Sequence, residues 1–106
     1  MIAADVGEAI SLRDEFAFSA MSALLSFKGT ERKPAVLAKN AYALADAMLR
    51  ARGAAGPVTL RDHLAEMAMN GLVSGEGVSV KLDLSARIAF ELADGMLAAR
   101  AAGGVQ

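Results

Sequence analysis

Mostly apolar residues recur every three or four positions in four stretches of the chain. The first stretch has two adjacent stripes, which consist of Leu12, Phe16, Ala20, Leu24 and of Ala17, Met21, Leu25. A spacing of four places side chains on one side of a helix, whereas a strand would alternate every two residues. Similar stripes follow at Leu37, Ala41, Leu44, Met48, at Leu60, Leu64, Ala68, Leu72 and at Ser85, Ala89, Leu92, Met96. The pattern therefore predicts four helices.

The four stretches are two copies of one unit. Residues 11–52 and 59–100 align without insertion at an offset of 48 positions, and 19 of the 42 aligned pairs are identical. Each copy reads Ser/Thr-Leu-Arg-Asp, an apolar stretch, a polar loop, and then Ala-Tyr/Phe-x-Leu-Ala-Asp-x-Met-Leu-x-Ala-Arg. Repetition at a fixed period indicates one supersecondary unit used twice. Residues 53–58, which contain two glycines and a proline, form the linker between the units.

The ends of the helices carry recognisable signals. Ser11 and Thr59 precede the first helix of each unit and have an aspartate three positions later, which is a variant of the capping box. Pro34 suits a first helical turn, and Arg52-Gly53 suits a helix end. Because residues 75–81 alternate between apolar and polar types, a short extended segment at Val78 to Leu82 is an alternative for that loop.

These elements predict an all-α fold in which two tandem antiparallel helical hairpins, residues 11–52 and 59–100, form a pseudo-two-fold four-helix bundle. A hairpin alone would expose its apolar stripe, so two hairpins are expected to pack against each other within one domain of residues 1–106. Alanines on the second helix of each unit would allow those two helices to approach closely; they are Ala38, Ala41, Ala45, Ala86, Ala89 and Ala93.

The amino-acid composition excludes several kinds of functional site. The chain has 11 Lys and Arg against 12 Asp and Glu, no cysteine and one histidine, His63. Disulfides, thiol catalysis and multi-histidine metal sites are thereby excluded, and we expect neither a cofactor nor a metal. The longest uncharged run, Phe16 to Phe27, has 12 residues, fewer than the roughly 20 that span a bilayer. With no basic start of a signal peptide, we expect a cytoplasmic protein without a membrane segment.

Four charged positions of the repeated motif recur in both units: Arg13 and Arg61, Asp14 and Asp62, Asp46 and Asp94, and Arg52 and Arg100. We predict structural roles for them as helix caps and ion pairs. An ion pair between Asp46 or Asp94 and Arg13 or Arg61 on a neighbouring helix would explain the recurrence of the aspartates. A catalytic dyad of Asp46 and Asp94 is the competing interpretation, but neither a histidine nor a phosphate-binding loop supports it. We therefore expect that the protein is not an enzyme.

The differences between the units indicate a binding surface. Phe18 and Phe27 of the first unit correspond to Glu66 and Gly75 of the second, so Phe18 should lie at the surface if Glu66 does. Clustered cations accompany them, and we predict that a protein partner contacts Phe18, Phe27, Lys28, Arg32 and Lys33. Alternatively, residues 1–10 fold over Phe18, or the basic loop Lys28 to Lys39 contacts nucleic acid, an interaction that the net charge of −1 disfavours.

The ordered pattern Leu-Arg-Asp followed by Ala-Asp-Ala/Gly-Met-Leu-x-Ala-Arg resembles a family of small phage and prophage proteins, here in tandem duplicate. The resemblance implies an accessory protein in the bacterial cytoplasm that binds a bacterial or phage protein, for instance as an inhibitor of a host defence such as CRISPR. It supplies no catalytic residues. A phage structural or assembly protein that forms homo-oligomers is the other role it leaves open.

Overall fold

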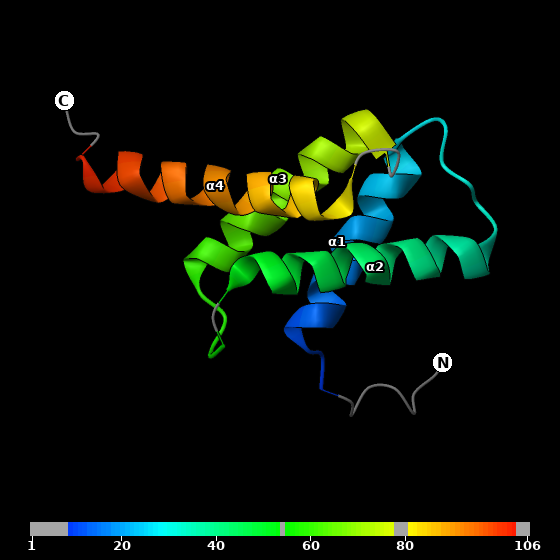
Figure 1. Ribbon diagram of the computed structural model, residues 1–106, viewed down its shortest axis with the longest axis horizontal. Coiled ribbons are helices and arrows are strands. Elements are labelled where there is room, and N and C mark those ends of the chain that lie inside the picture. Colours follow the sequence, from blue (N-terminus) through cyan, green and yellow to red (C-terminus); the bar gives the residue numbers. More distant parts are fainter. Residues whose placement is uncertain (1–8, 54, 78–80, 104–106) are drawn as a thin grey trace.

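The computed structural model describes residues 9–53, 55–77 and 81–103. Four helices run through them, α1 (Leu12–Ser26), α2 (Pro34–Arg52), α3 (Leu60–Glu76) and α4 (Leu82–Ala101) (Figure 1). The helices pack as α1 on α2 and α3 on α4, and contacts of α1 with α3 and of α2 with α4 join the two pairs. The described residues contain no strand. The predicted all-α four-helix bundle of two helical hairpins is therefore confirmed.

Hairpin one consists of α1 and α2, and hairpin two consists of α3 and α4. Figure 1 shows α2 and α4 side by side and running in the same direction, with α1 and α3 crossing them steeply. Of the six alanines expected at this approach, Ala41, Ala45, Ala86, Ala89 and Ala93 are buried. Ala38 is exposed instead.

The helix ends follow the local signals in the sequence. Asp14 and Ser11 form the predicted capping box, in which the Asp14 amide donates to Ser11 Oγ at 3.1 Å and the Ser11 amide donates to the Asp14 carboxylate at 3.1 Å. α2 begins at Pro34 and ends before Gly53, whose φ of 76° is a left-handed conformation that suits glycine. Leu82 is the first residue of α4, and residues 78–80 of the proposed extended segment lie outside the described residues.

One continuous core joins the hairpins. Phe16 of α1 meets Phe90 of α4 edge to face, with ring centroids 6.3 Å apart, and Leu24, Leu44, Met48 and Met69 are completely buried. Such edge-to-face pairs contribute roughly 0.5–1.5 kcal/mol beyond the burial of their area. The core therefore lies between the hairpins as well as within them.

The hairpins do not bury equivalent positions. The apolar stripes predicted for α3 and α4 do not match the faces that these helices bury. In α3 the buried apolar residues are Ala65, Met69 and Val73 rather than Leu60, Leu64, Ala68 and Leu72. In α4 Leu92 and Met96 are 48% and 59% exposed, although their counterparts Leu44 and Met48 are fully buried. A two-fold interface would bury the same positions in both hairpins. The two-fold relation thus holds for the order and pairing of the helices and not for the faces that meet.

Candidate protein-binding groove

The recurring charged residues form the same ion pair in each hairpin. Arg13 Nε donates to Asp46 Oδ1 at 2.7 Å, and Arg61 Nε donates to Asp94 Oδ1 at 2.7 Å. Each guanidinium also stacks 4.6 Å from the centroid of an aromatic ring of its own hairpin, Tyr42 or Phe90. The pairs link the two helices of a hairpin, so they explain why both aspartates recur.

This geometry excludes the Asp46–Asp94 dyad. A dyad would raise the pKa of one carboxyl through the charge of the other. Instead, the hydrogen bond from Arg13 lowers the pKa of Asp46, and the hydrogen bond from Arg61 lowers the pKa of Asp94. Both carboxylates are therefore held ionised in separate ion pairs.

Asp14 and Asp62 occupy equivalent positions but have different partners. Asp14 accepts a hydrogen bond from the Tyr42 hydroxyl at 2.9 Å, whereas Asp62 accepts from Arg52 Nε at 2.8 Å and from Arg52 Nη2 at 2.9 Å. The Asp62 side chain is only 2% exposed. Burial raises the pKa of Asp62, but Arg52 and the Thr59 amide lower it by more, so the pKa lies below its usual range. The Arg52–Asp62 pair ties the end of hairpin one to the start of hairpin two.

An apolar groove opens between α1 and α2 of hairpin one. It has a volume of about 260 Å³ and is lined by Ala17, Phe18, Met21, Pro34, Leu37, Ala38, Ala41 and Tyr42; we call these residues the binding groove. Phe18 and Met21 on its α1 side are 48% and 44% exposed. Phe18 and Met21 therefore bury only part of their apolar surface, which is the usual condition of a contact site before its partner binds.

The counterpart of this groove in hairpin two is filled. Six of its eight positions are buried there, namely Ala65, Met69, Ser85, Ala86, Ala89 and Phe90. Phe16 of hairpin one contacts Phe90 at this place, and Arg50 of α2 binds Asp83 of α4 beside it at 2.8 Å. Hairpin one therefore occupies the groove of hairpin two, and the groove of hairpin one has no such occupant among the described residues.

The predicted contact residues separate into two groups. Phe18 lies in the binding groove, as the partner prediction requires, although its stated basis was wrong: Glu66 is half-buried and faces Glu15 of α1. Phe27 lies elsewhere, because its ring packs so closely on Gly77 that a Cβ there would lie 2.6 Å from it. The alternative that residues 1–10 cover Phe18 falls mostly outside the described residues.

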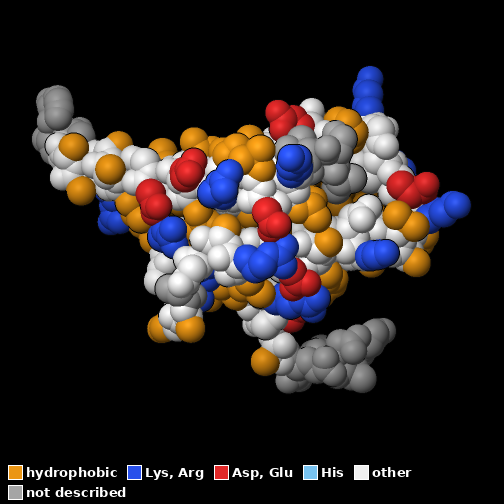
Figure 2. Space-filling model, in the orientation of Figure 1, with side chains coloured by type: hydrophobic (Ala, Val, Ile, Leu, Met, Phe, Trp, Pro, Cys, Tyr) orange, Lys and Arg blue, Asp and Glu red, His pale blue; other side chains and the backbone are white. Residues whose placement is uncertain are grey.

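The basic loop lies at one end of the molecule, between α1 and α2. Lys28, Arg32 and Lys33 are exposed, and Figure 2 shows Lys and Arg side chains at the end where this loop lies in Figure 1. Arg32 Nη2 donates to the Leu25 carbonyl at 3.0 Å, which fixes the loop against the end of α1. The cations thus surround one end of the hairpin rather than line the binding groove.

Sequence reasoning missed a cluster between α1 and α3. Ligand atoms of Glu15, His63 and Glu66 all lie within 4.8 Å of one another. Burial, and next the charge of Glu15, raise the pKa of Glu66. A divalent cation could use such donors, but exposed groups of this kind are common at helix surfaces and do not define a metal site. The spacing of His63 and Glu66 on one helix face was the available signal.

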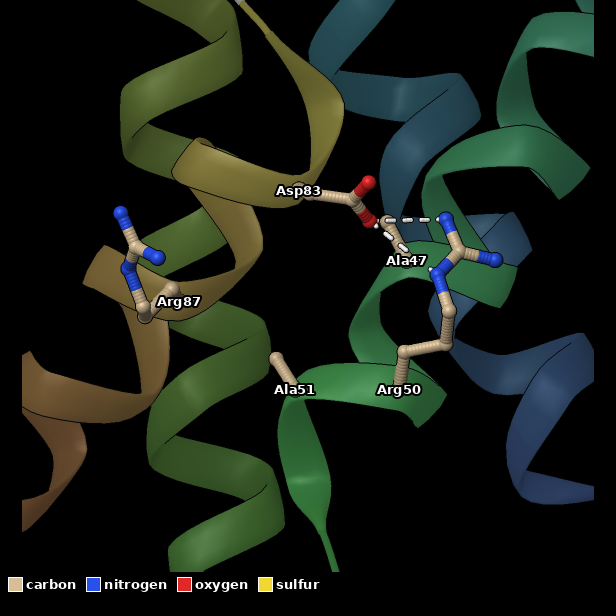
Figure 3. Close-up of a pocket in the computed structure, with 5 residues that line it drawn as sticks. All are labelled: Ala47, Arg50, Ala51, Asp83 and Arg87. Atoms are coloured by element: carbon tan, nitrogen blue, oxygen red, sulfur yellow. Dashed lines mark hydrogen bonds and ion pairs between the residues drawn. The ribbon is translucent and has the colours of Figure 1, made fainter.

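A second hollow lies between α2 and α4. It measures about 330 Å³ and is lined by Ala47, Arg50, Ala51, Asp83 and Arg87. Figure 3 shows that Arg50 and Asp83 face each other across it, while Arg87 points away. Arg50 and Asp83 are exposed and already form an ion pair, so the hollow is a feature of the junction between the hairpins.

Comparison with protein-family models, with curated proteins and with solved structures finds no match. No helix within the described part of the chain is long and apolar enough to cross a membrane. The groove, the ion pairs and the unequal burial of the repeats are therefore the observations that bear on function.

Proposed function

We propose that this protein is a non-enzymatic binding protein that holds a helical surface of another protein chain in the binding groove between α1 and α2. The observation that carries the proposal is the filled groove of hairpin two. The same repeated sequence there accepts a helical surface formed by Phe16 and its neighbours. The equivalent groove of hairpin one, identical at four of its eight positions, stands open.

The energetics favour an occupant. α1 is apolar around much of its circumference, with Phe16, Ala20 and Leu24 facing the core and Phe18 and Met21 facing the groove. A helix that is apolar all round is normally covered on all sides. Full burial of a Phe or Met side chain contributes roughly 1.5–3 kcal/mol, of which the exposed fraction remains to be gained.

The resemblance to phage proteins extends the proposal to the source of the partner, a bacterial or phage protein, with a host defence system such as CRISPR among the targets it suggests. The exposed cations Lys28 and Lys33 beside the groove favour a partner with acidic residues around its apolar contact. Binding of nucleic acid by these cations is the competing function.

Site-specific photo-cross-linking in bacterial cells tests the proposal. A benzophenone amino acid at position 18 is expected to cross-link a protein, and the same probe at position 36 serves as control. Val36 is 38% exposed on α2 but does not line the groove. Cross-links to nucleic acid alone, or equal protein cross-linking from both positions, would contradict a protein-binding groove.

A further inference from the structure

The two hairpins meet through different faces. The equivalent of each buried face is exposed on the other hairpin. Hairpin one presents Phe16, Ala20, Leu24, Leu44 and Met48, all fully buried. Their counterparts in hairpin two are Leu64, Ala68, Leu72, Leu92 and Met96, which we call the outer face; each of them is partly or largely exposed. Among the described residues, hairpin one is fully covered on this side, whereas hairpin two is covered only in part, at Leu64 and Ala68.

Individual contacts show that the interface is directional. Asn70 Nδ2 of α3 donates to the Ser19 carbonyl of α1 at 3.0 Å. A symmetric interface would also join their counterparts, Ser22 and Met67, but both of these residues are exposed. The ion pair between Arg50 and Asp83 also has no symmetric equivalent, because the counterparts of these residues are the exposed Ala98 and Ala35. The hairpins therefore meet head to tail.

On this basis we infer that the partner of the binding groove is the outer face of a second copy of this chain, docked as hairpin one docks on hairpin two. The inference rests on the proposed function, because it names the occupant of the same groove. A head-to-tail contact leaves one groove and one outer face free at the ends, so it extends to chains of copies or closes into a ring.

The residues of the two open faces suit each other. Leu64 of one copy would lie against Tyr42 of the next, as Phe16 lies against Phe90. His63 of one copy would face Glu15 and Phe18 of the next. Within the chain Glu15 lies close to the like-charged Glu66, but the contact between copies would bring no two carboxylates together at this place. Arg100, which is exposed, would reach Asp14 of the next copy in the way that Arg52 binds Asp62.

The charges of the two hairpins also favour a head-to-tail contact between copies. Residues 11–52 contain seven basic and four acidic residues, and residues 59–100 contain four basic and six acidic residues. A head-to-tail contact joins a positive hairpin to a negative one, whereas a symmetric contact would join hairpins of like charge.

Sedimentation equilibrium of the full chain and of two variants tests the inference. The unmodified chain should associate as concentration rises. Met21→Glu in the groove and Met96→Glu on the outer face should each weaken association at least about thirtyfold, because Met69, the counterpart of Met21, is fully buried in the filled groove. Val36→Glu is the matched control and should associate normally, because its counterpart Leu84 remains 37% exposed beside the filled groove.

Mixing distinguishes a head-to-tail contact from every symmetric one. Met21→Glu retains its outer face and Met96→Glu retains its groove, so an equimolar mixture should form a 1:1 dimer although each variant alone is monomeric. Circular dichroism confirms that both are folded. A chain that is monomeric at all concentrations, or a mixture that stays monomeric, would overturn the inference. Cross-linking from position 18 to a different protein would overturn it too while leaving the proposed function intact.

Discussion

Leu44 and Leu92 occupy the same place in the repeated sequence and lie in opposite environments. Leu44 is completely buried between the hairpins, and Leu92 is 48% exposed on the outer face. The groove shows the reverse, since it is open in hairpin one and filled in hairpin two. Two copies of one unit have thus acquired different surfaces by packing in sequence, as the units of a repeat protein do.

The largest expected difference between the hairpins concerns their aspartate caps. Asp62→Asn should destabilise the fold by about 3–5 kcal/mol, because it breaks the ion pair between the buried Asp62 carboxylate and Arg52. Asp14→Asn, at the equivalent position, should cost only about 1 kcal/mol as a weakened cap. Urea unfolding of both variants measures the difference, and equal losses would contradict a special role for the Arg52–Asp62 pair.

The same pair predicts a pH dependence. Because the pKa of Asp62 is lowered in the folded state, its stabilisation is complete above the ordinary aspartate pKa of about 3.9 and disappears as pH falls through the folded pKa. The unfolding free energy of Asp62→Asn should therefore vary less with pH over this acidic range than that of the unmodified chain.

Leu44→Ala and Leu92→Ala form the next comparison. The first should cost about 2–5 kcal/mol because it creates a cavity in the core. The second should change the stability of the monomer by less than about 0.5 kcal/mol, as for other surface substitutions. Chemical denaturation at low protein concentration checks both values, and a large loss for Leu92→Ala would place that residue in the core.

Tyr42→Phe makes hairpin one resemble hairpin two at the position of Phe90. It removes the hydrogen bond to Asp14 and should lower the unfolding free energy by about 0.5–1.5 kcal/mol. Thermal unfolding followed by circular dichroism would detect the change. An unchanged midpoint would show that the hydroxyl contributes nothing to joining α1 and α2.

The smallest effect has the opposite sign. Burial and the charge of Glu15 raise the pKa of Glu66, so its ionised form destabilises the fold at neutral pH. Glu66→Gln should therefore stabilise the protein slightly at neutral pH, and the gain should vanish below the ordinary glutamate pKa, where Glu66 is protonated in both states. A gain that persists in acid would point to a cause other than this charge.

Much of the fold could be predicted from the sequence, because its determinants are local. Ser11, Asp14, Pro34 and Gly53 mark helix ends through their own hydrogen bonds and backbone conformations. The recurrence of Asp46 likewise pointed to its arginine partner, since hairpins of equal sequence form equal internal contacts.

The choice of buried faces could not be predicted in this way. α1 and α3 are apolar on two adjacent faces, so their stripes are compatible with either face turned inward. Which face is covered depends on contacts between hairpins far apart in sequence, such as Phe16 with Phe90. The binding groove followed from that choice, and only Phe18 among its residues was identified beforehand.

Thiol labelling at one pair of equivalent positions tests most directly whether the repeats are packed differently. The chain contains no cysteine, so Met48→Cys and Met96→Cys each introduce a single reporter. At low protein concentration the Met96→Cys thiol should react with a maleimide at least about a hundredfold faster, because the other site reacts only after the fold opens. Equal rates at the two positions would contradict the head-to-tail packing of the hairpins.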